Sequence, residues 1–188
     1  MPSVLVPIAE GVEEIEVVTI IDVLRRARWD VVAAAVHPGP AAGSPAPVTA
    51  SRGVRIVPDA EWASINPLDF DLLVLPGGAG GTDVLKGDAR VLDAVRGFVS
   101  AGKLVGAICA APLVLQAAGV LNGRKATCHP SVRAQLTSAQ LQTDAVVVDG
   151  GIMTSQGPGT AIAFALALIR RVAGPAAAET VAKALVLP

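Results

Sequence analysis

The sequence predicts an α/β three-layer sandwich, in which helices cover both faces of a mostly parallel sheet. Short apolar runs alternate along the 188 residues with longer segments of helical periodicity, and this alternation is typical of parallel strands joined by helices. The composition agrees, because 52% of the residues are hydrophobic and 16% are charged, which suits a sheet buried on both faces. We expect one domain over residues 1–188.

The predicted strands are the short apolar runs rich in Val, Leu and Ile. Buried strands are expected at residues 4–8, 31–36, 72–75, 104–108 and 145–148, and four or five of them would form the parallel core. Shorter extended pieces are expected at residues 54–57, 126–128 and 152–154.

The predicted helices follow the longer periodic segments. They cover residues 13–27, 89–101, 112–118, 159–172 and 176–184. Several end at Gly or are followed by Pro, as helices commonly do. Residues 37–50 are rich in Pro, Gly and Ala, so we expect a surface loop there.

The composition also limits the partners. The net charge is −1 and the aromatic residues are three Phe and two Trp, which leaves neither a basic stripe for phosphates nor a platform for stacked bases. Nucleic acid is therefore not expected as a partner. The longest apolar run, residues 161–169, is too short to cross a bilayer. The first residues lack the basic region of a signal peptide, and two Cys cannot form a disulfide framework, so we expect a cytoplasmic protein.

Ligands of open parallel sheets bind at the carboxyl ends of the strands, and Cys109 follows one such strand. In Ala107-Ile108-Cys109-Ala110-Ala111-Pro112 an apolar run passes through the cysteine into a helix. Small neighbours permit the sharp turn of a nucleophile elbow, and the positive end of the helix would lower the thiol pKa. Cys109 is thus a candidate nucleophile, and the alternative is a small buried core residue.

Glu16 is the second candidate. It shares a helical face with the apolar Ile20, Val23 and Ala27, so its carboxyl is expected to be removed from water. Burial raises the pKa of a carboxyl, and a neutral carboxyl can donate a hydrogen bond or move a proton near pH 7. Glu13 and Glu14 need no role beyond complementing the helix dipole.

Three further junctions offer binding groups. The four glycines among residues 77–81 expose backbone N–H groups that can hold an anion, but they lack the spacing of a nucleotide-binding loop. His129 follows a short extended piece, and its neighbour Cys128 makes a metal site a minor alternative, although adjacent strand residues face opposite ways. Residues 155–160 form a turn that opens a helix, and capping is its simplest role.

In this order the segments resemble the ThiJ/PfpI superfamily, in the bacterial-type branch of the parkinsonism-associated deglycase (DJ-one). The resemblance rests on residues 11–16, 51–54, 75–78, 107–112, 127–130, 154–160 and 184–187. It implies a flavodoxin-like fold, usually a homodimer, in which a protonated glutamate hydrogen-bonds a cysteine on a nucleophile elbow. The matching residues are Cys109 and Glu16, with His129 as the nearby imidazole and the amides of Gly78 and Ala110 as oxyanion donors. The remaining members of the implied substrate site are Gly77, Arg52, Ser155, Gly157 and Pro158.

The resemblance further implies an enzyme, without metal or cofactor, that converts reactive carbonyls such as methylglyoxal or glyoxal to hydroxy acids. The resemblance also implies glycation adducts, including those of nucleic acid, and cyclic anhydrides as other substrates. The alternative role is an oxidative-stress sensor or chaperone that works through oxidation of Cys109. Cys128 would then be either a resolving thiol or an inert buried residue.

Two positions depart from the family pattern. Ala110 stands where protease-like members have a histidine, which argues against a cysteine peptidase or amidase. Gln156 stands where the animal members have an arginine, and Arg52 can approach that place from a partner subunit.

A homodimer has support from the sequence as well. The helix predicted at residues 13–27 is apolar almost all round, with Val17, Val18, Ile20, Ile21, Val23 and Leu24. One sheet face cannot cover all of these side chains, so we expect a second copy of the chain to cover the rest.

Overall fold

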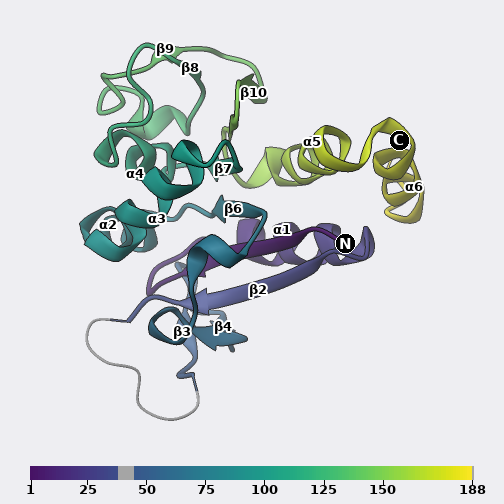
Figure 1. The fold of residues 1–188 in the computed structure, drawn as a ribbon, viewed down its shortest axis with the longest axis horizontal. Helices are drawn as coiled ribbons and strands as arrows, with labels where there is room; N and C mark the ends of the chain where they lie inside the picture. The colour runs from purple at the N-terminus through teal and green to yellow at the C-terminus, as the bar shows by residue number, and fades with distance from the viewer. Residues whose placement is uncertain (38–44, 188) are drawn as a thin grey trace.

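The computed structural model describes residues 1–37 and 45–187, and its centre is a seven-stranded sheet (Figure 1). The strands are β1 (Ser3–Ile8), β2 (Asp30–Ala35), β5 (Ala60–Glu61), β6 (Leu72–Leu75), β7 (Leu104–Ile108), β10 (Val146–Asp149) and β11 (Ile152–Ser155). Their order is β10-β11-β7-β6-β1-β2-β5, and every pair is parallel except β10 with β11. The predicted mostly parallel sheet is confirmed.

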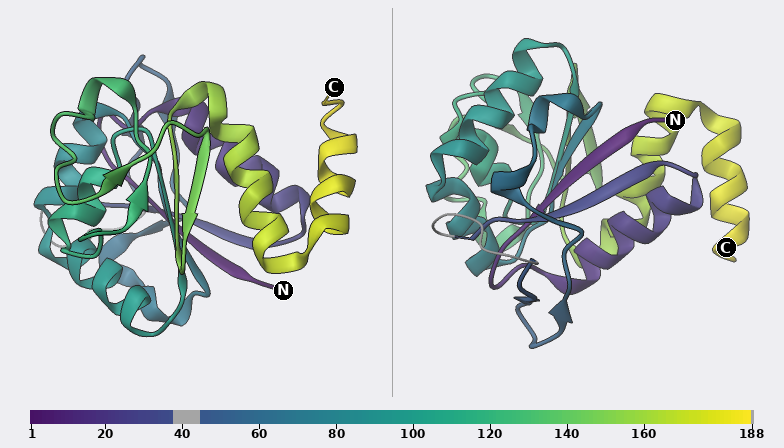
Figure 2. Two further views of the ribbon diagram at one scale, coloured as in Figure 1. Left: turned by 90° about the horizontal axis from the view of Figure 1, so that it is seen from above. Right: turned by 60° about the horizontal axis from the view of Figure 1, so that its bottom comes forward.

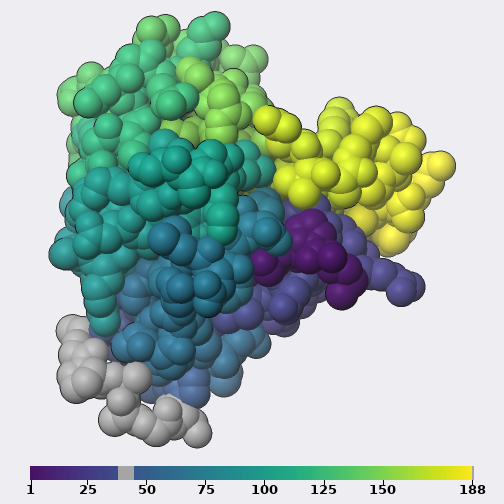
Figure 3. All heavy atoms as spheres, viewed as in Figure 1, coloured from purple at the N-terminus to yellow at the C-terminus, as the bar shows by residue number. Residues whose placement is uncertain are grey.

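Helices cover both faces of this sheet (Figure 2). One face carries α1 (Glu14–Arg26), α5 (Ala161–Ala173) and α6 (Pro175–Ala184), and the other carries α2 (Ala79–Gly87), α3 (Ala89–Ser100) and α4 (Pro112–Ala117). Each layer buries its own apolar cluster, and α5 and α6 stand out at one side of the molecule (Figure 3). In the described part of the chain, no helix is both long enough and apolar enough to cross a bilayer.

One predicted strand has a different place from the one expected. The sequence places residues 145–148 in the buried parallel core, but β10 is an antiparallel edge strand and its Val148 is 48% exposed. The reason is the two-residue connection between β10 and β11, in which Gly150 has φ +60°. Such a short connection permits only an antiparallel hairpin.

The remaining extended pieces form small accessory sheets. β3 (Val48–Thr49) pairs with β4 (Arg55–Ile56), and β8 (Lys125–Ala126) pairs with β9 (Gln140–Leu141). Within the predicted loop at residues 37–50, residues 38–44 lie outside the described residues, while Val48 is buried in β3. The loop prediction is therefore wrong at β3.

Helix α2 is absent from the predicted elements, because its glycines disfavour a helix by intrinsic propensity. The fold requires them where α2 meets the loop after β1. A Cβ on Gly81 would lie 2.8 Å from the Cα of Val12, and a Cβ on Gly80 would lie 3.2 Å from the Cα of Gly11. The backbone of the first turn of α2 thus packs directly against the backbone of the loop after β1.

The strand order places the site. From β1 the chain adds β2 on one side and later β6 and β7 on the other. The loops that follow β1 and β6 therefore diverge at the carboxyl ends of these strands, which is the usual position of a ligand site in such folds. The register pairs Leu75 with Ala107 and Ile108 with Ser155, so the residues that follow these strands meet there.

Candidate active site

Cys109 occupies a strained turn between β7 and α4. Its φ is +63°, in the left-handed region that a residue with a Cβ seldom adopts. The backbone holds this conformation from both sides, because Cys109 N–H donates to Ser155 O at 3.0 Å and Cys109 O accepts from His129 N–H at 2.8 Å. Pro112 opens α4 directly afterwards. This is the geometry of the predicted nucleophile elbow.

Glu16 lies beside Cys109, in the first turn of α1. Its side chain is fully buried, and its Oε2 accepts the Gly77 N–H at 2.7 Å. A Cβ on Gly77 would lie 2.6 Å from the Cβ of Cys109 and 2.9 Å from Glu16 Oε2. The other carboxyl oxygen, Oε1, is buried without a hydrogen-bond partner among the described residues, and the thiol and the carboxyl lie close enough to shift each other's pKa. The structure therefore brings together the acid and the thiol that the sequence singled out.

The two groups influence each other's ionisation. Burial raises the pKa of Glu16 to about 7, against the opposing effect of the Gly77 amide. Burial and the negative charge of Glu16 raise the pKa of Cys109 to about 12, while the amides of Gly78 and Ala110 lower it. The predicted lowering of the thiol pKa by the helix dipole is thus wrong, because burial outweighs it. The thiol lowers the pKa of Glu16 and the carboxylate raises that of Cys109, so the first negative charge on the pair lies on the carboxylate.

A cavity of about 510 Å³ opens over Cys109. Its wall includes six residues that the sequence analysis named, which are Arg52, Gly78, Cys109, Ala110, His129 and Pro158. Gly78 has φ +87° and precedes α2, where a Cβ would lie 2.4 Å from Gly11 O. This close fit directs the Gly78 amide towards the sulfur of Cys109.

Arg52 lines the cavity of its own chain. Its loop is anchored by Glu14, whose carboxylate accepts the Ser51 hydroxyl and the Arg52 N–H, both at 2.7 Å. Glu14 therefore does more than complement the helix dipole. The exposed Arg52 guanidinium supplies a positive charge at the cavity rim.

His129 also lines the cavity, and it caps a short 3-10 helix, Pro130–Val132. Its Nδ1 is 2.7 Å from the Ser131 hydroxyl oxygen and accepts the Ser131 N–H at 3.2 Å. Cys128 is fully buried in an apolar cluster, whereas His129 is partly exposed, and both follow the end of β8 at Ala126. The neighbours Cys128 and His129 thus belong to different environments.

The predicted turn residues divide into two groups. Pro158 lines the cavity, and Gly157 lies against the imidazole, where a Cβ would be 3.2 Å from His129 Cδ2. Ser155 is fully buried, and its hydroxyl donates to Ala145 O at 2.7 Å and pairs with Thr160. Its observed contacts are structural.

Several cavity residues were missed by the sequence analysis. Glu13 caps α1 by accepting the Glu16 N–H at 2.8 Å, and Gly11, Ser51, Ser131 and Val132 also line the wall. The spacing from Glu13 to Glu16 is a capping signal that was available in the sequence. Ser131 follows His129 and Pro130, and no pattern in the sequence indicated that it would line the cavity.

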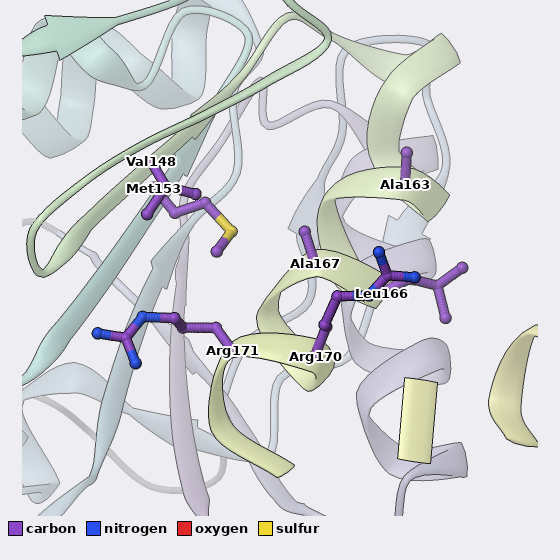
Figure 4. Close-up of a pocket in the computed structure, with 7 residues that line it drawn as sticks. All are labelled: Val148, Met153, Ala163, Leu166, Ala167, Arg170 and Arg171. Atoms are coloured by element: carbon purple, nitrogen blue, oxygen red, sulfur yellow. The ribbon is translucent and has the colours of Figure 1, made fainter. Parts of the chain in front are cut away.

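A larger cavity, of about 590 Å³, lies between the β10–β11 hairpin and α5 (Figure 4). It is lined by Val148, Met153, Ala163, Leu166, Ala167, Arg170 and Arg171. It shares no residue with the cavity over Cys109. The side chains of its wall include no thiol, hydroxyl or carboxyl group, so we assign the candidate site to Cys109.

The fold and the site define a class, the flavodoxin-like α/β proteins with a cysteine on a nucleophile elbow. A model of the DJ-1/PfpI family matches residues 2–171, so the chain belongs to that family.

Individual relatives agree with this placement. Protein dj-1beta of Drosophila melanogaster is 42% identical to this chain, and the match covers 98% of this chain and 97% of the relative. The crystal structure of that protein superposes with a TM-score of 0.92 at 40% identity, and it covers 100% of this chain and 98% of the solved chain. The glutathione-independent glyoxalase DJR-1.2 of Caenorhabditis elegans is 35% identical over 95% of this chain and 92% of the relative. Protein DJ-1 homolog B of Arabidopsis thaliana is 41% identical over 92% of this chain, which spans only 38% of that protein.

Proposed function

We propose that this protein is a cysteine-dependent enzyme that converts small reactive dicarbonyls, such as methylglyoxal or glyoxal, to hydroxy acids without an external thiol. The observation that carries the proposal is the coupling of Cys109 to the buried Glu16 beside an amide-lined cavity. The nematode relative named a glutathione-independent glyoxalase supports the substrate class.

The first step is addition of the thiol to the aldehyde. Glu16 takes the proton of Cys109 and the sulfur attacks the aldehyde carbon, whose oxygen takes the electron pair of the carbonyl bond. Glu16 then gives the proton to that oxygen, which completes the hemithioacetal and returns Glu16 to its carboxylate form. The amides of Gly78 and Ala110 lie at the sulfur and are placed to stabilise the oxygen that becomes negative.

The second step moves hydrogen between the two carbons of the substrate. A carboxyl whose pKa is about 7 can remove the proton from the first carbon and return it to the second, which leaves a thioester. Water then hydrolyses the thioester. One dicarbonyl and one water give one hydroxy acid, and the free thiol returns. Glycation adducts of the same carbonyls fit the same thiol chemistry.

The test is turnover of methylglyoxal in the absence of glutathione. We expect Cys109→Ser to lose at least about 100-fold in kcat, because the nucleophile is removed. Cys128→Ala is the matched control, since Cys128 is buried away from the cavity, and it should retain turnover. Equal activity of the wild type and Cys109→Ser would rule out the proposal.

A second function, oxidative-stress sensing with or without chaperone activity, has one specific observation in its favour. Cys109 is 9% exposed, and amides together with a proton-bearing carboxyl surround its sulfur, a setting that suits the added oxygens of a sulfinate. Mild peroxide followed by intact-mass analysis tests this function. Sensing predicts a selective gain of two oxygens that Cys109→Ala abolishes and Cys128→Ala retains.

We also propose that the protein is a homodimer. Val17, Ile20, Val23 and Leu24 are buried within the chain, whereas Ile15 and Val18 of α1 are 56% and 53% exposed. The nearby β3–β4 region adds exposed Val54 and Val57. Light scattering after size-exclusion chromatography tests the proposal, and a monomer at micromolar concentration would contradict it.

Two minor assignments complete the proposal. Cys109 and Cys128 are both free thiols, which supports a reducing compartment such as the cytoplasm. Gln156 supports the bacterial-type branch, while the three relatives described above are eukaryotic.

A further inference from the structure

The side chain of His129 is held by one residue that no motif marks. Ser131 contributes two groups to the same ring nitrogen. Its backbone N–H lies 3.2 Å from Nδ1, and its hydroxyl oxygen lies 2.7 Å from Nδ1.

These contacts determine which ring nitrogen carries hydrogen. A backbone amide can only donate, so the Nδ1 that receives it must present its lone pair. The Ser131 hydroxyl then donates to Nδ1 as well. In the neutral ring the hydrogen therefore lies on Nε2.

The position of the ring gives this tautomer a consequence. His129 lines the cavity over Cys109, and its Cδ2 edge lies against Gly157. Nδ1 is occupied by Ser131, so Nε2 is the ring nitrogen left to serve a ligand. In the part of the chain that the structure describes, no hydrogen bond to Nε2 is formed.

We propose that Ser131 is a positioning residue that fixes His129 as the Nε2–H tautomer, so that the imidazole donates a hydrogen bond to a substrate oxygen and does not act as a base. The catalytic consequence rests on the proposed function. In the dicarbonyl adduct, the sulfur is bonded to one of the two neighbouring carbons. The acceptor of the hydrogen bond from Nε2 is the oxygen on the other carbon. Glu16 then remains the group that moves protons.

The experiment observes the tautomer directly. The chain has two histidines, so ring ¹⁵N spectra of labelled protein contain two ring systems, and His37→Gln identifies the signals of His129. At about pH 9, where a histidine ring is neutral, we expect Nδ1 to show the shift of an unprotonated nitrogen and Nε2 that of a protonated one.

Variants of Ser131 connect the tautomer to turnover. Ser131 is exposed, so its replacement leaves the core intact. Ser131→Ala keeps the amide but loses the hydroxyl, and we expect a population with hydrogen on Nδ1 together with a kcat about fivefold lower, the effect of losing one neutral hydrogen bond. Ser131→Thr retains the hydroxyl and should restore both the spectrum and kcat.

The outcomes separate this inference from the proposed function. A proton on Nδ1 in the wild type, or a Ser131→Ala variant with unchanged spectrum and unchanged kcat, overturns the role of Ser131. A changed spectrum with unchanged kcat overturns the donor role of His129. Absence of turnover in the wild type would remove the proposed function, while the spectra would still decide the tautomer.

Discussion

Glu16 and Cys109 meet across the Cα of Gly77, so closely that one added methyl group at that position would contact both. A Cβ on Gly77 would lie 2.9 Å from the carboxyl oxygen and 2.6 Å from the cysteine Cβ. The contact between acid and thiol thus depends on a residue without a side chain.

Gly77→Ala should separate the pair. We expect a loss of about 100-fold in kcat for methylglyoxal, the effect of displacing a reacting group by about 1 Å. Gly87→Ala is the matched control, because a Cβ there meets nothing within 4 Å and the backbone φ is not positive. Steady-state kinetics on both variants provide the measurement, and similar kcat values for the two would contradict the expected geometry.

The reactivity of Cys109 should follow the titration of the pair. Above pH about 7, Glu16 loses its proton, and the carboxylate can then accept the thiol proton as the sulfur attacks. Alkylation by iodoacetamide, monitored by mass spectrometry, should therefore rise through a midpoint near pH 7. In Glu16→Gln that step should disappear, leaving a thiol whose pKa is raised by burial. Identical midpoints in the two proteins would show that the groups are not coupled.

The stability of the fold should also depend on Glu16. Its pKa is raised from 4.5 to about 7, so the folded state binds a proton that the unfolded state has released between these values. The contribution to stability is present below pH 4.5 and is lost as the pH rises towards 7. We expect Glu16→Gln to be more stable than the wild type by up to about 3 kcal/mol at pH 8 and equal to it near pH 4.5. Urea unfolding at both pH values measures the difference, and no change with pH would refute the assignment.

Arg52 should favour substrates that carry a negative charge. Its guanidinium is exposed at the cavity rim, where an ion pair is worth at most about 1 kcal/mol. Arg52→Gln should raise KM for glyoxylate about threefold and leave KM for methylglyoxal unchanged. Arg55→Gln removes a neighbouring exposed charge that does not line the cavity. If Arg55→Gln raised KM for glyoxylate by the same factor, the overall charge of the protein rather than a specific contact with Arg52 would be responsible.

Much of the fold was predictable because local signals agreed with tertiary packing. The apolar runs of β1, β2, β6 and β7 are buried on both faces, so composition alone marks them. Helix α2 was not predicted, because its glycines are required by close backbone packing against Gly11 and Val12, which lie far away in the sequence. Local propensity carries no information about such a contact.

The site was predictable to a similar degree. The apolar stripe of α1 predicted the burial of Glu16, and the small neighbours of Cys109 predicted the turn. The thiol pKa was predicted with the wrong sign, because the helix dipole is visible in the sequence but the burial and the carboxylate charge that oppose it depend on the fold. Ser131 gave no signal, since its role depends on the orientation of one imidazole.

The hydrogen bond from Cys109 N–H to Ser155 O has a consequence for how the protein is made. During synthesis the cysteine leaves the ribosome well before β11 does, and until that strand joins β7 nothing on that side fixes the turn. A nascent chain that ends before residue 155 therefore contains the thiol in a relaxed backbone, without the finished pocket around it. The arrangement of the thiol, the carboxyl and the amides is therefore complete only after β11 has paired with β7.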